Sequence, residues 1–468
     1  MRAASVFVLF IASFTYVTAQ INATGTIASR ALGIPFEAGV WVGLISILIC
    51  SMLGGMRAVT WTQVAQYIVL IIAYLIPVFW ISSNVGGGIF PHLMLGDEVA
   101  RLGELEQQFG LVKNSAADMK AAGVPGGLKY ISGTHSGVPE GGMAVWKYLS
   151  LAICMMVGTA SLPHILMRYF TTPTVRAARK SVAWSLFFIF LLYSSAPMLA
   201  TLSKLALMDP NLPTGIIGKS ISEVQSIEWV QRWSEVKQVF IADFNGDGIL
   251  QLNEWFMRGD VVVLATPEVA GLPFVISGLV FAGGMAAAMS TADGLVLAIS
   301  NALSHDIYYK IIDPKADTAK RLLVARVLLV IIGAAGAYIA SFRLTSILGS
   351  VAWAFDFAMS GLFFPLVLGV WWKRATREGA IAGILAGIIS GTVYLTWVFP
   401  KFSVPIWGGV NTPFLGIDHL RFGLIGAPIC LVVMVVVSLM TKEPSPATQK
   451  LVDDTRIPTG KAILGKQH

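Results

Sequence analysis

Long apolar segments recur along this chain of 468 residues, and they constrain its fold more than any other feature. A helix needs about 20 mostly apolar residues to cross the hydrocarbon core of a bilayer. Only 13% of the residues are charged, well below the usual share in soluble proteins, which argues against soluble enzymes and nucleic-acid-binding proteins. We therefore predict an all-α, polytopic membrane protein of about ten transmembrane helices. The expected spans lie near residues 4–24, 38–55, 64–83, 146–167, 182–204, 272–303, 321–341, 345–371, 379–399 and 421–441.

The distribution of charge predicts which side of the membrane each connection faces. With both termini in the cytoplasm, the inside segments hold 17 Lys/Arg against 7 Asp/Glu, whereas the two long outside loops hold 8 against 14. An excess of Lys and Arg is typical of the cytoplasmic side, so we predict a multi-pass protein with both termini cytoplasmic. Residues 1–19 also resemble a secretory signal that ends in small residues, and we favour an uncleaved first span.

The predicted spans divide the chain into membrane segments and two outer insertions. Insertions of this length usually carry function or are disordered, and residues 84–144 contain no recognisable chemical motif. The division is spans in 1–83, an outer loop in 84–144, spans in 145–204, an outer subdomain in 205–265, spans in 266–371, two peripheral spans in 372–441 and a cytoplasmic tail in 442–468.

The second insertion contains the motif D-F-N-G-D-G-I-L-Q-L-N-E at residues 243–254. It matches the calcium loop of an EF-hand, with glycine at the sixth position where the turn is sharp. Flanking helices over 226–241 and 253–260 would complete the helix-loop-helix frame. The motif predicts a structural calcium ion of weak, extracellular-type affinity, and the alternative is an Asx-rich turn that binds no metal. The candidate ligands are Asp243, Asn245, Asp247, the carbonyl of Ile249, Gln251 through water, and Glu254.

Three ionisable residues stand out within predicted spans, where a charge is expensive and therefore a functional candidate. His164 follows Pro163, and we expect it to hydrogen-bond backbone that the proline frees. Asp356 suits either a substrate path or one half of an interhelical polar pair, and the sequence does not choose between them. Asp293 lies three residues after Ser290 and is a candidate for the substrate or ion path. Isolated groups of this kind do not form a catalytic cluster, so we predict that the protein is not an enzyme.

The small and polar segment 283–293 is the most informative part of the predicted membrane region. The hydroxyls of Ser290 and Thr291 and the carbonyl of Ala287 can converge on one side of a slightly opened helix, as hard oxygen ligands of an alkali cation. Asp293 would add negative charge nearby. The alternative is a tight packing seam whose hydroxyls donate back to helix carbonyls. The residues alone leave both interpretations open.

Five sequence pieces, in this order, resemble the sodium/solute symporter family. They are spread over almost the whole chain, at residues 54–62, 163–170, 289–291, 304–308 and 371–380. The residues at 290–294 and 301–306, together with the inserted calcium-type loop, resemble the branch of cation/acetate symporters.

The resemblance implies an inverted-repeat fold of five plus five helices, with ion and solute bound near the midplane. It places the family's sodium site on Ala287, Ser290 and Thr291, and it favours the cation interpretation. Aligned in this way, the first span corresponds to the third core helix, so this fold would lack its first helices. We expect that the start codon is misassigned, and a remnant that cannot transport is the alternative.

These observations predict a sodium-coupled symporter of the bacterial cytoplasmic (inner) membrane that imports a short-chain monocarboxylate such as acetate. Its ions would be co-transported sodium and a structural calcium. Its partners would be the small-molecule solute, membrane lipids and a small membrane subunit, with no nucleic acid. The alternatives are a transporter-like solute sensor, a truncated non-transporting fragment, and an amino acid or another small solute as the substrate.

Overall fold

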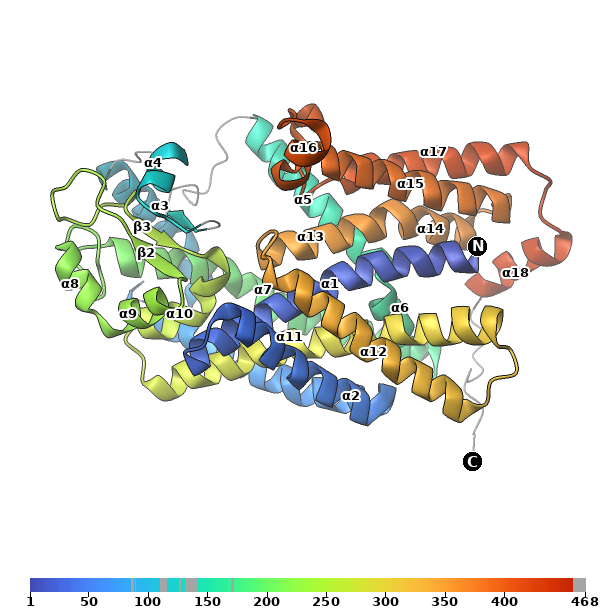
Figure 1. The fold of residues 1–468 in the computed structure, drawn as a ribbon, viewed down its shortest axis with the longest axis horizontal. Helices are drawn as coiled ribbons and strands as arrows, with labels where there is room; N and C mark the ends of the chain where they lie inside the picture. Colours follow the sequence, from blue (N-terminus) through green and yellow to red (C-terminus); the bar gives the residue numbers. More distant parts are fainter. Residues whose placement is uncertain are drawn as a thin grey trace.

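A long helical bundle carries a small mixed subdomain at one end in the computed structural model (Figure 1). The structure describes residues 1–85, 88, 90–109, 116–125, 128–130, 142–169 and 172–457. The N-terminus and the short helix α18 (Pro446–Arg456) lie at the end of the bundle opposite the subdomain. We call these the N-terminal end and the subdomain end.

The apolar helices of the described residues account for all ten predicted segments, which confirms the all-α membrane fold. Eight helical stretches are long and apolar enough to cross a membrane, a ninth is the bent pair α5 (Gly142–Ser161) and α6 (Pro163–Tyr169), and Phe36–Met52 is a shorter apolar helix. The eight are α1 (Arg2–Leu32), Val59–Asn84 of α2 (Phe36–Asn84), α7 (Val175–Met208), α11 (Phe274–Asn301) with the π-helix η2 (Ala302–Ile312), α12 (Thr318–Ser341), α13 (Ile347–Ala358) through the π-helix η3 (Met359–Phe363) to α14 (Phe364–Trp371), α15 (Arg377–Val398) and α17 (Gly423–Met440).

Proline explains the one sharp break among these spans. The helices α5 and α6 meet at an angle of 47°. Pro163 has no amide hydrogen and cannot continue the hydrogen-bond pattern of α5, so the span is interrupted there. The predicted span over 146–167 therefore corresponds to two helices, with Pro163 at their junction.

Helix α2 contains two apolar stretches, a first arm over Phe36–Met52 and a second arm over Val59–Asn84. Both arms lie against α11. Ser51 in the first arm donates to Asp293, and Gln63 in the second arm donates to the carbonyl of Ser290. Further along the second arm, the Ala73 side chain lies 2.5 Å from where a side chain on Gly283 would begin. Glycine therefore allows these helices to approach closely, as small residues do in membrane helix interfaces.

The two outer insertions, predicted as separate units, share one small sheet. Strand β1 (Lys129–Tyr130) comes from the first insertion, and β2 (Val239–Ile241) and β3 (Trp255–Met257) come from the second. The strands are antiparallel in the order β1-β3-β2. The helical elements around the sheet are α3 (Pro91–Phe109), α4 (Ala116–Ala121), α8 (Ile221–Ser226), α9 (Glu228–Glu235), the 3-10 turn η1 (Gly259–Val261) and α10 (Val262–Val269).

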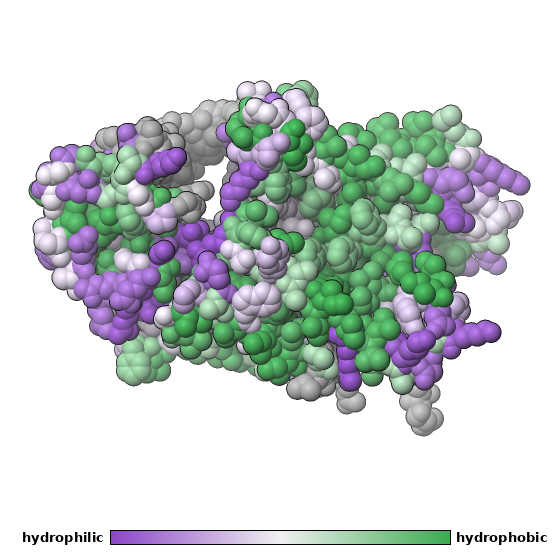
Figure 2. Space-filling view, in the orientation of Figure 1, coloured by the Kyte–Doolittle hydropathy of each residue, from purple (hydrophilic) through white to green (hydrophobic). Residues whose placement is uncertain are grey.

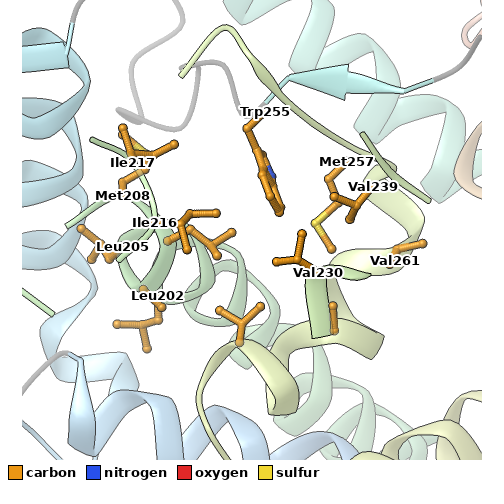
Figure 3. Packing of buried hydrophobic residues seen from close by; sticks show 14 of the residues in the cluster. Leu202, Leu205, Met208, Ile216, Ile217, Val230, Val239, Trp255, Met257 and Val261 are labelled. Carbon is orange, nitrogen blue, oxygen red and sulfur yellow. The ribbon is translucent and has the colours of Figure 1, made fainter. Parts of the chain in front are cut away.

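An apolar cluster attaches this subdomain to the bundle. Trp255 on β3 and Trp233 on α9 are fully buried, and they share the cluster with Leu202 and Leu205 near the end of α7. Figure 3 shows the α7 side chains and the hairpin side chains facing one another across this cluster. Burial of large aromatic side chains is a major favourable term in folding, so the subdomain is fixed to α7 by packing.

A polar contact fixes the subdomain a second time, at the end of α1. The Arg30 guanidinium donates to Glu268 Oε1 at 2.7 Å, and the Trp233 indole donates to Glu268 Oε2. The guanidinium also lies 5.0 Å from the centre of the Trp233 ring. Arg30 and Glu268 are both largely buried, so this contact links α1, α9 and α10 in an environment with little solvent screening.

Close glycine contacts hold the remaining helices together. A side chain on Gly387 of α15 would begin 2.1 Å from the carbonyl oxygen of Ser360, and one on Gly426 of α17 would begin 2.3 Å from the Ser360 hydroxyl. Along the chain, α15 and α17 are connected through α16 (Pro400–Trp407) and the turn η4 (Phe414–Gly416). Figure 2 shows a broad hydrophobic band over the middle of the bundle, with hydrophilic residues gathered toward its two ends.

Candidate ion and solute site

Both hydroxyls of the predicted pair on α11 donate back to a helix carbonyl, which is the hydrogen-bond pattern of the packing alternative. Ser290 Oγ donates to the carbonyl of Ala287 at 2.9 Å, and Thr291 Oγ1 lies 3.3 Å from the same oxygen. All three residues are half-buried. The helix α11 runs through them without interruption, so the predicted slight opening is absent in this structure. The back-bonded hydroxyls are compatible with both the cation interpretation and the packing interpretation.

Polar groups from α2 surround this segment of α11. Gln63 donates to the Ser290 carbonyl, and Ser51 Oγ donates to Asp293 Oδ1 at 2.8 Å. Asp293 is fully buried, and its Oδ2 has no hydrogen-bond partner among the described residues. Asp293 thus follows the hydroxyl pair on α11, and one of its carboxylate oxygens faces α2.

Asp356 lies apart from that cluster, near the start of α17. It is fully buried, and its neighbours include the Cys154 side chain and the backbone at Phe422 and Gly423. A side chain on Gly423 would begin 2.7 Å from Asp356 Oδ1. Glycine therefore lets the carboxylate approach the N-terminal end of α17, which carries partial positive charge. This arrangement resembles the interhelical alternative more closely than an open path.

The expected hydrogen bond from His164 to freed backbone is absent from its Nδ1, which has no partner in the described structure. The imidazole instead packs edge-to-face against the Tyr16 ring, with 5.7 Å between ring centres. Its contacts are therefore those of a packed aromatic ring between α6 and α1.

The predicted EF-hand frame is wrong, because strands rather than helices flank the loop 243–254. Strands β2 and β3 pair in register from Val239 opposite Met257 to Ile241 opposite Trp255. Helix α9 ends before Lys237, which has a positive φ of 56°. The β-branched and aromatic residues beyond it favour extended backbone, so the loop is the tip of a β-hairpin.

Hydrogen bonds inside the loop are those of consecutive Asx turns. Asp243 accepts the amides of Gly246 and Gly248, and Asp247 accepts the amide of Ile249 at 2.8 Å. Buried Glu254 accepts the amides of Phe244 and Gln251. The Ile249 amide holds the pKa of Asp247 below its usual range.

Among the described residues, no three His, Cys, Asp or Glu side chains are grouped closely enough to hold a metal ion. The side chains of Asn245 and Gln251 both donate to Asp247 Oδ2. The loop nevertheless keeps the six oxygen-bearing positions of the predicted calcium motif within twelve consecutive residues.

Sequence reasoning missed the groups that surround the α11 hydroxyls. Gln63 and Ser51 are polar residues in apolar helices, and that alone could have marked them as candidates. Arg168 belongs to the family-like piece 163–170, and nothing in the sequence placed it beside α11. In the structure its Nη2 lies 3.2 Å from where a side chain on Gly294 would begin, one helical turn beyond the hydroxyl pair.

A bundle of membrane-length helices with an interrupted span is the arrangement found in many secondary transporters. The model of the sodium:solute symporter family matches residues 1–221 and 261–387. The chain belongs to this family. The matched ranges leave out 222–260, which include the hairpin loop.

Two curated relatives agree with this assignment. An uncharacterised symporter of Cupriavidus necator is 36% identical over 531 aligned residues, covering 97% of this chain and 77% of the relative. A monocarboxylic acid transporter of Corynebacterium glutamicum is 25% identical over 430 residues, covering 89% of this chain and 67% of the relative.

A solved structure shows the same fold. A Na⁺-coupled sialic acid symporter in a substrate-bound, outward-open state superposes with a TM-score of 0.58, over 95% of this chain and 75% of the other. The sequence identity is 14%, so this similarity concerns the fold alone. Membership of the sodium:solute symporter family makes the protein a sodium-coupled membrane transporter for a small solute.

Proposed function

We propose that this protein couples inward sodium movement to the uptake of a short-chain monocarboxylate such as acetate, and that Ala287, Ser290 and Thr291 bind the ion. The observation that carries the proposal is the convergence of two hydroxyls on one carbonyl, within 3.3 Å, in the middle of a membrane helix. Hydroxyl and carbonyl oxygens are suitable ligands for a dehydrated alkali cation. The relative from Corynebacterium glutamicum, named a monocarboxylic acid transporter, supports this class of solute.

Sodium supplies the driving force in this proposal. Each elementary charge that moves inward releases about 2.3 kcal/mol per 100 mV of membrane potential, in addition to its concentration gradient. A state that binds ion and solute together links that energy to accumulation. Asp293, three residues from Ser290, contributes negative potential near the ion in this proposal, and its contact with Ser51 keeps α2 and α11 in one arrangement.

The test is uptake of labelled acetate into proteoliposomes under an imposed sodium gradient. Replacing two ligands costs roughly 1.4 kcal/mol each, so Ser290→Ala with Thr291→Ala should lower the uptake by on the order of a hundredfold. Ser277→Ala, a buried serine on the same helix, is the matched control and should change little. Undiminished uptake by the double variant would contradict the ion site.

The same preparation separates the proposal from its rivals. Binding of labelled acetate without accumulation would favour a solute sensor, and neither binding nor accumulation would favour a non-transporting fragment. Competition by an amino acid at lower concentrations than acetate would favour that solute class instead. The sodium dependence and the solute identity are therefore measured independently.

We further propose that the N-terminal end of the bundle faces the cytoplasm of a bacterium and that the subdomain lies outside the inner membrane. The Lys/Arg excess in the connections at the N-terminal end supports this orientation. Labelling of an introduced cysteine at exposed Lys219 by an impermeant reagent on intact cells tests it. Lack of labelling on cells, with labelling of inside-out vesicles, would reverse the orientation.

Calcium binding by loop 243–254 is a separate proposal. Asp243 and Asp247 lie in the exposed part of the loop, and Glu254 occupies the twelfth position. We expect millimolar calcium to protect the hairpin of the full-length protein from proteolysis, with affinity on the order of 10⁻⁴ to 10⁻³ M. Asp247→Asn should abolish this protection. Equal protection by magnesium, or none up to ten millimolar calcium, would contradict it.

A further inference from the structure

A cavity of about 590 Å³ lies at the N-terminal end of the bundle, on the same face of α11 as the hydroxyl pair. Ala298, Asn301, Ala302 and His305 form its wall on α11 and η2. Side chains three and four residues apart share one face of a helix. Counting back from Ala298 in such steps leads through Gly294 to the hydroxyl pair at 290 and 291.

The other walls of the cavity come from two helices that contact this face. Leu9 belongs to α1, and Pro163, Leu166 and Met167 belong to α6. Asp306 also lines the cavity and lies 3.8 Å from Arg2 at the exposed N-terminal end of the bundle, where both side chains are more than one third exposed. The cavity therefore connects the surface at the N-terminal end with a point about 12 Å along α11 from Ser290, at 1.5 Å per residue.

Two polar side chains lie over the one remaining turn between cavity and hydroxyls. A side chain on Gly294 would begin 3.2 Å from Arg168 Nη2 and 3.7 Å from Gln63 Nε2. Arg168 comes from the end of α6 and Gln63 from the second arm of α2. The absence of a side chain at Gly294 gives the guanidinium room to lie against the helix.

The charge of this side chain determines what it does to an ion on this face. A guanidinium stays protonated at every physiological pH. It repels a cation, and this repulsion is stronger where surrounding protein excludes water. A cation that moves from Ser290 and Thr291 to the cavity along this face of α11 passes the guanidinium beside Gly294.

We infer that this cavity is the inner end of the ion path and that Arg168 is the charge barrier that separates it from Ser290 and Thr291. The inference rests on the proposed function for the identity of the ion. In a symporter such a barrier prevents sodium from crossing without its solute, and it has to move when the loaded protein opens toward the N-terminal end. Arg168 is thus a positioning residue, because it controls access to the ion ligands without being one of them.

The test compares the access of small thiol reagents to cysteines on either side of the barrier. The parent has Cys50→Ala, since Cys50 is half-buried while Cys154 and Cys430 are buried. One reporter is Ala298→Cys in the cavity wall, and the other is Ser290→Cys beyond the barrier. Vesicles that present the N-terminal end are treated with a cationic trimethylammonium-ethyl or an anionic sulfonato-ethyl methanethiosulfonate, and the labelling rates are measured.

With Arg168 present, the cationic reagent should react at least tenfold more slowly with the 290 reporter than with the 298 reporter. Arg168→Gln should raise the cationic rate at 290 at least fivefold and leave the rate at 298 unchanged. Arg168→Lys keeps the charge and should keep most of the barrier. Arg176→Gln, a change of another arginine at the same end, is the control and should change neither rate.

Equal rates at the two reporters in the parent would overturn the inference, because no barrier would then lie between them. An Arg168→Lys variant that opens as far as Arg168→Gln would overturn the assignment to charge. Labelling requires no transport, so the outcome is separate from that of the uptake experiment. If Arg168 slows labelling at 290 but uptake does not depend on sodium, the proposed function is contradicted and the inferred charge barrier is supported.

Discussion

The helical bundle and the outer subdomain are held together by different kinds of contact. In the bundle, glycines such as Gly387 and Gly426 bring backbones together, and an added methyl group would collide with neighbouring oxygens. In the subdomain, two buried tryptophans and a short antiparallel sheet form the core. The family model matches residues 1–221 and 261–387 and omits 222–260 and 388–468. Gly387 therefore lies within the matched ranges, whereas Gly426 and both tryptophans lie outside them.

The largest effect that would test this comparison is the loss of an aromatic anchor. Trp255→Ala removes a fully buried side chain and should destabilise the subdomain by about 3 to 5 kcal/mol. Limited proteolysis should then cut the hairpin, while the detergent-solubilised bundle keeps its thermal unfolding transition. Ile249→Ala, at a side chain 47% exposed in the same hairpin, is the control. If the bundle unfolds at the same lowered temperature, the two regions are a single cooperative unit.

A smaller effect is expected from a methyl group added between helices of the bundle. Gly387→Ala places a carbon 2.1 Å from the Ser360 carbonyl and should cost roughly 1 to 3 kcal/mol, because two backbones must separate. Gly369→Ala has no neighbouring atom within 4 Å and serves as the matched control. Thermal unfolding in detergent measures both variants. Equal stability of the two would mean that close backbone contact is not what holds these helices.

The smallest effect concerns acid and the hairpin loop. The pKa of Asp247 is lowered in the folded protein, mainly by the Ile249 amide. A lowered pKa means that the ionised carboxylate stabilises the loop at neutral pH, and that this contribution disappears as the pH falls from the ordinary aspartate pKa through the lowered value. The hydrogen-exchange protection of the Ile249 amide, taken relative to the intrinsic rate at each pH, should fall over that acidic window. Asp247→Asn should remove this pH dependence, and an unchanged profile in that variant would assign the effect to another group.

The membrane spans were predictable because a bilayer imposes one simple requirement on composition. All ten apolar segments correspond to helices, and the convergence of Ser290 and Thr291 on the Ala287 carbonyl follows from helical spacing. The family membership was also predictable, because short motifs typical of the family, such as residues 163–170, occur in the expected order along the chain.

Contacts between distant segments were not predictable. Nothing in the sequence near Gly294 indicates that Arg168 lies against it, or that Ser51 reaches Asp293. The EF-hand frame failed for a related reason. The loop motif specifies ligand positions, whereas the backbone conformation of the flanking residues 239–241 and 255–257 depends on their pairing with each other. Pairing of β strands depends on partners, and a local pattern does not report them.

The pairing of β1 with β3 has a consequence for the order of assembly. Lys129 pairs with Met257, and two further spans, α5–α6 and α7, are made between them during synthesis. Lys129 and Tyr130 therefore cannot pair with β3 until α5–α6 and α7 have been synthesised and β3 has reached the same side of the membrane. Closing so long a loop is slow. The outer subdomain is thus a late-maturing part of the protein, completed only after its neighbouring spans have been inserted.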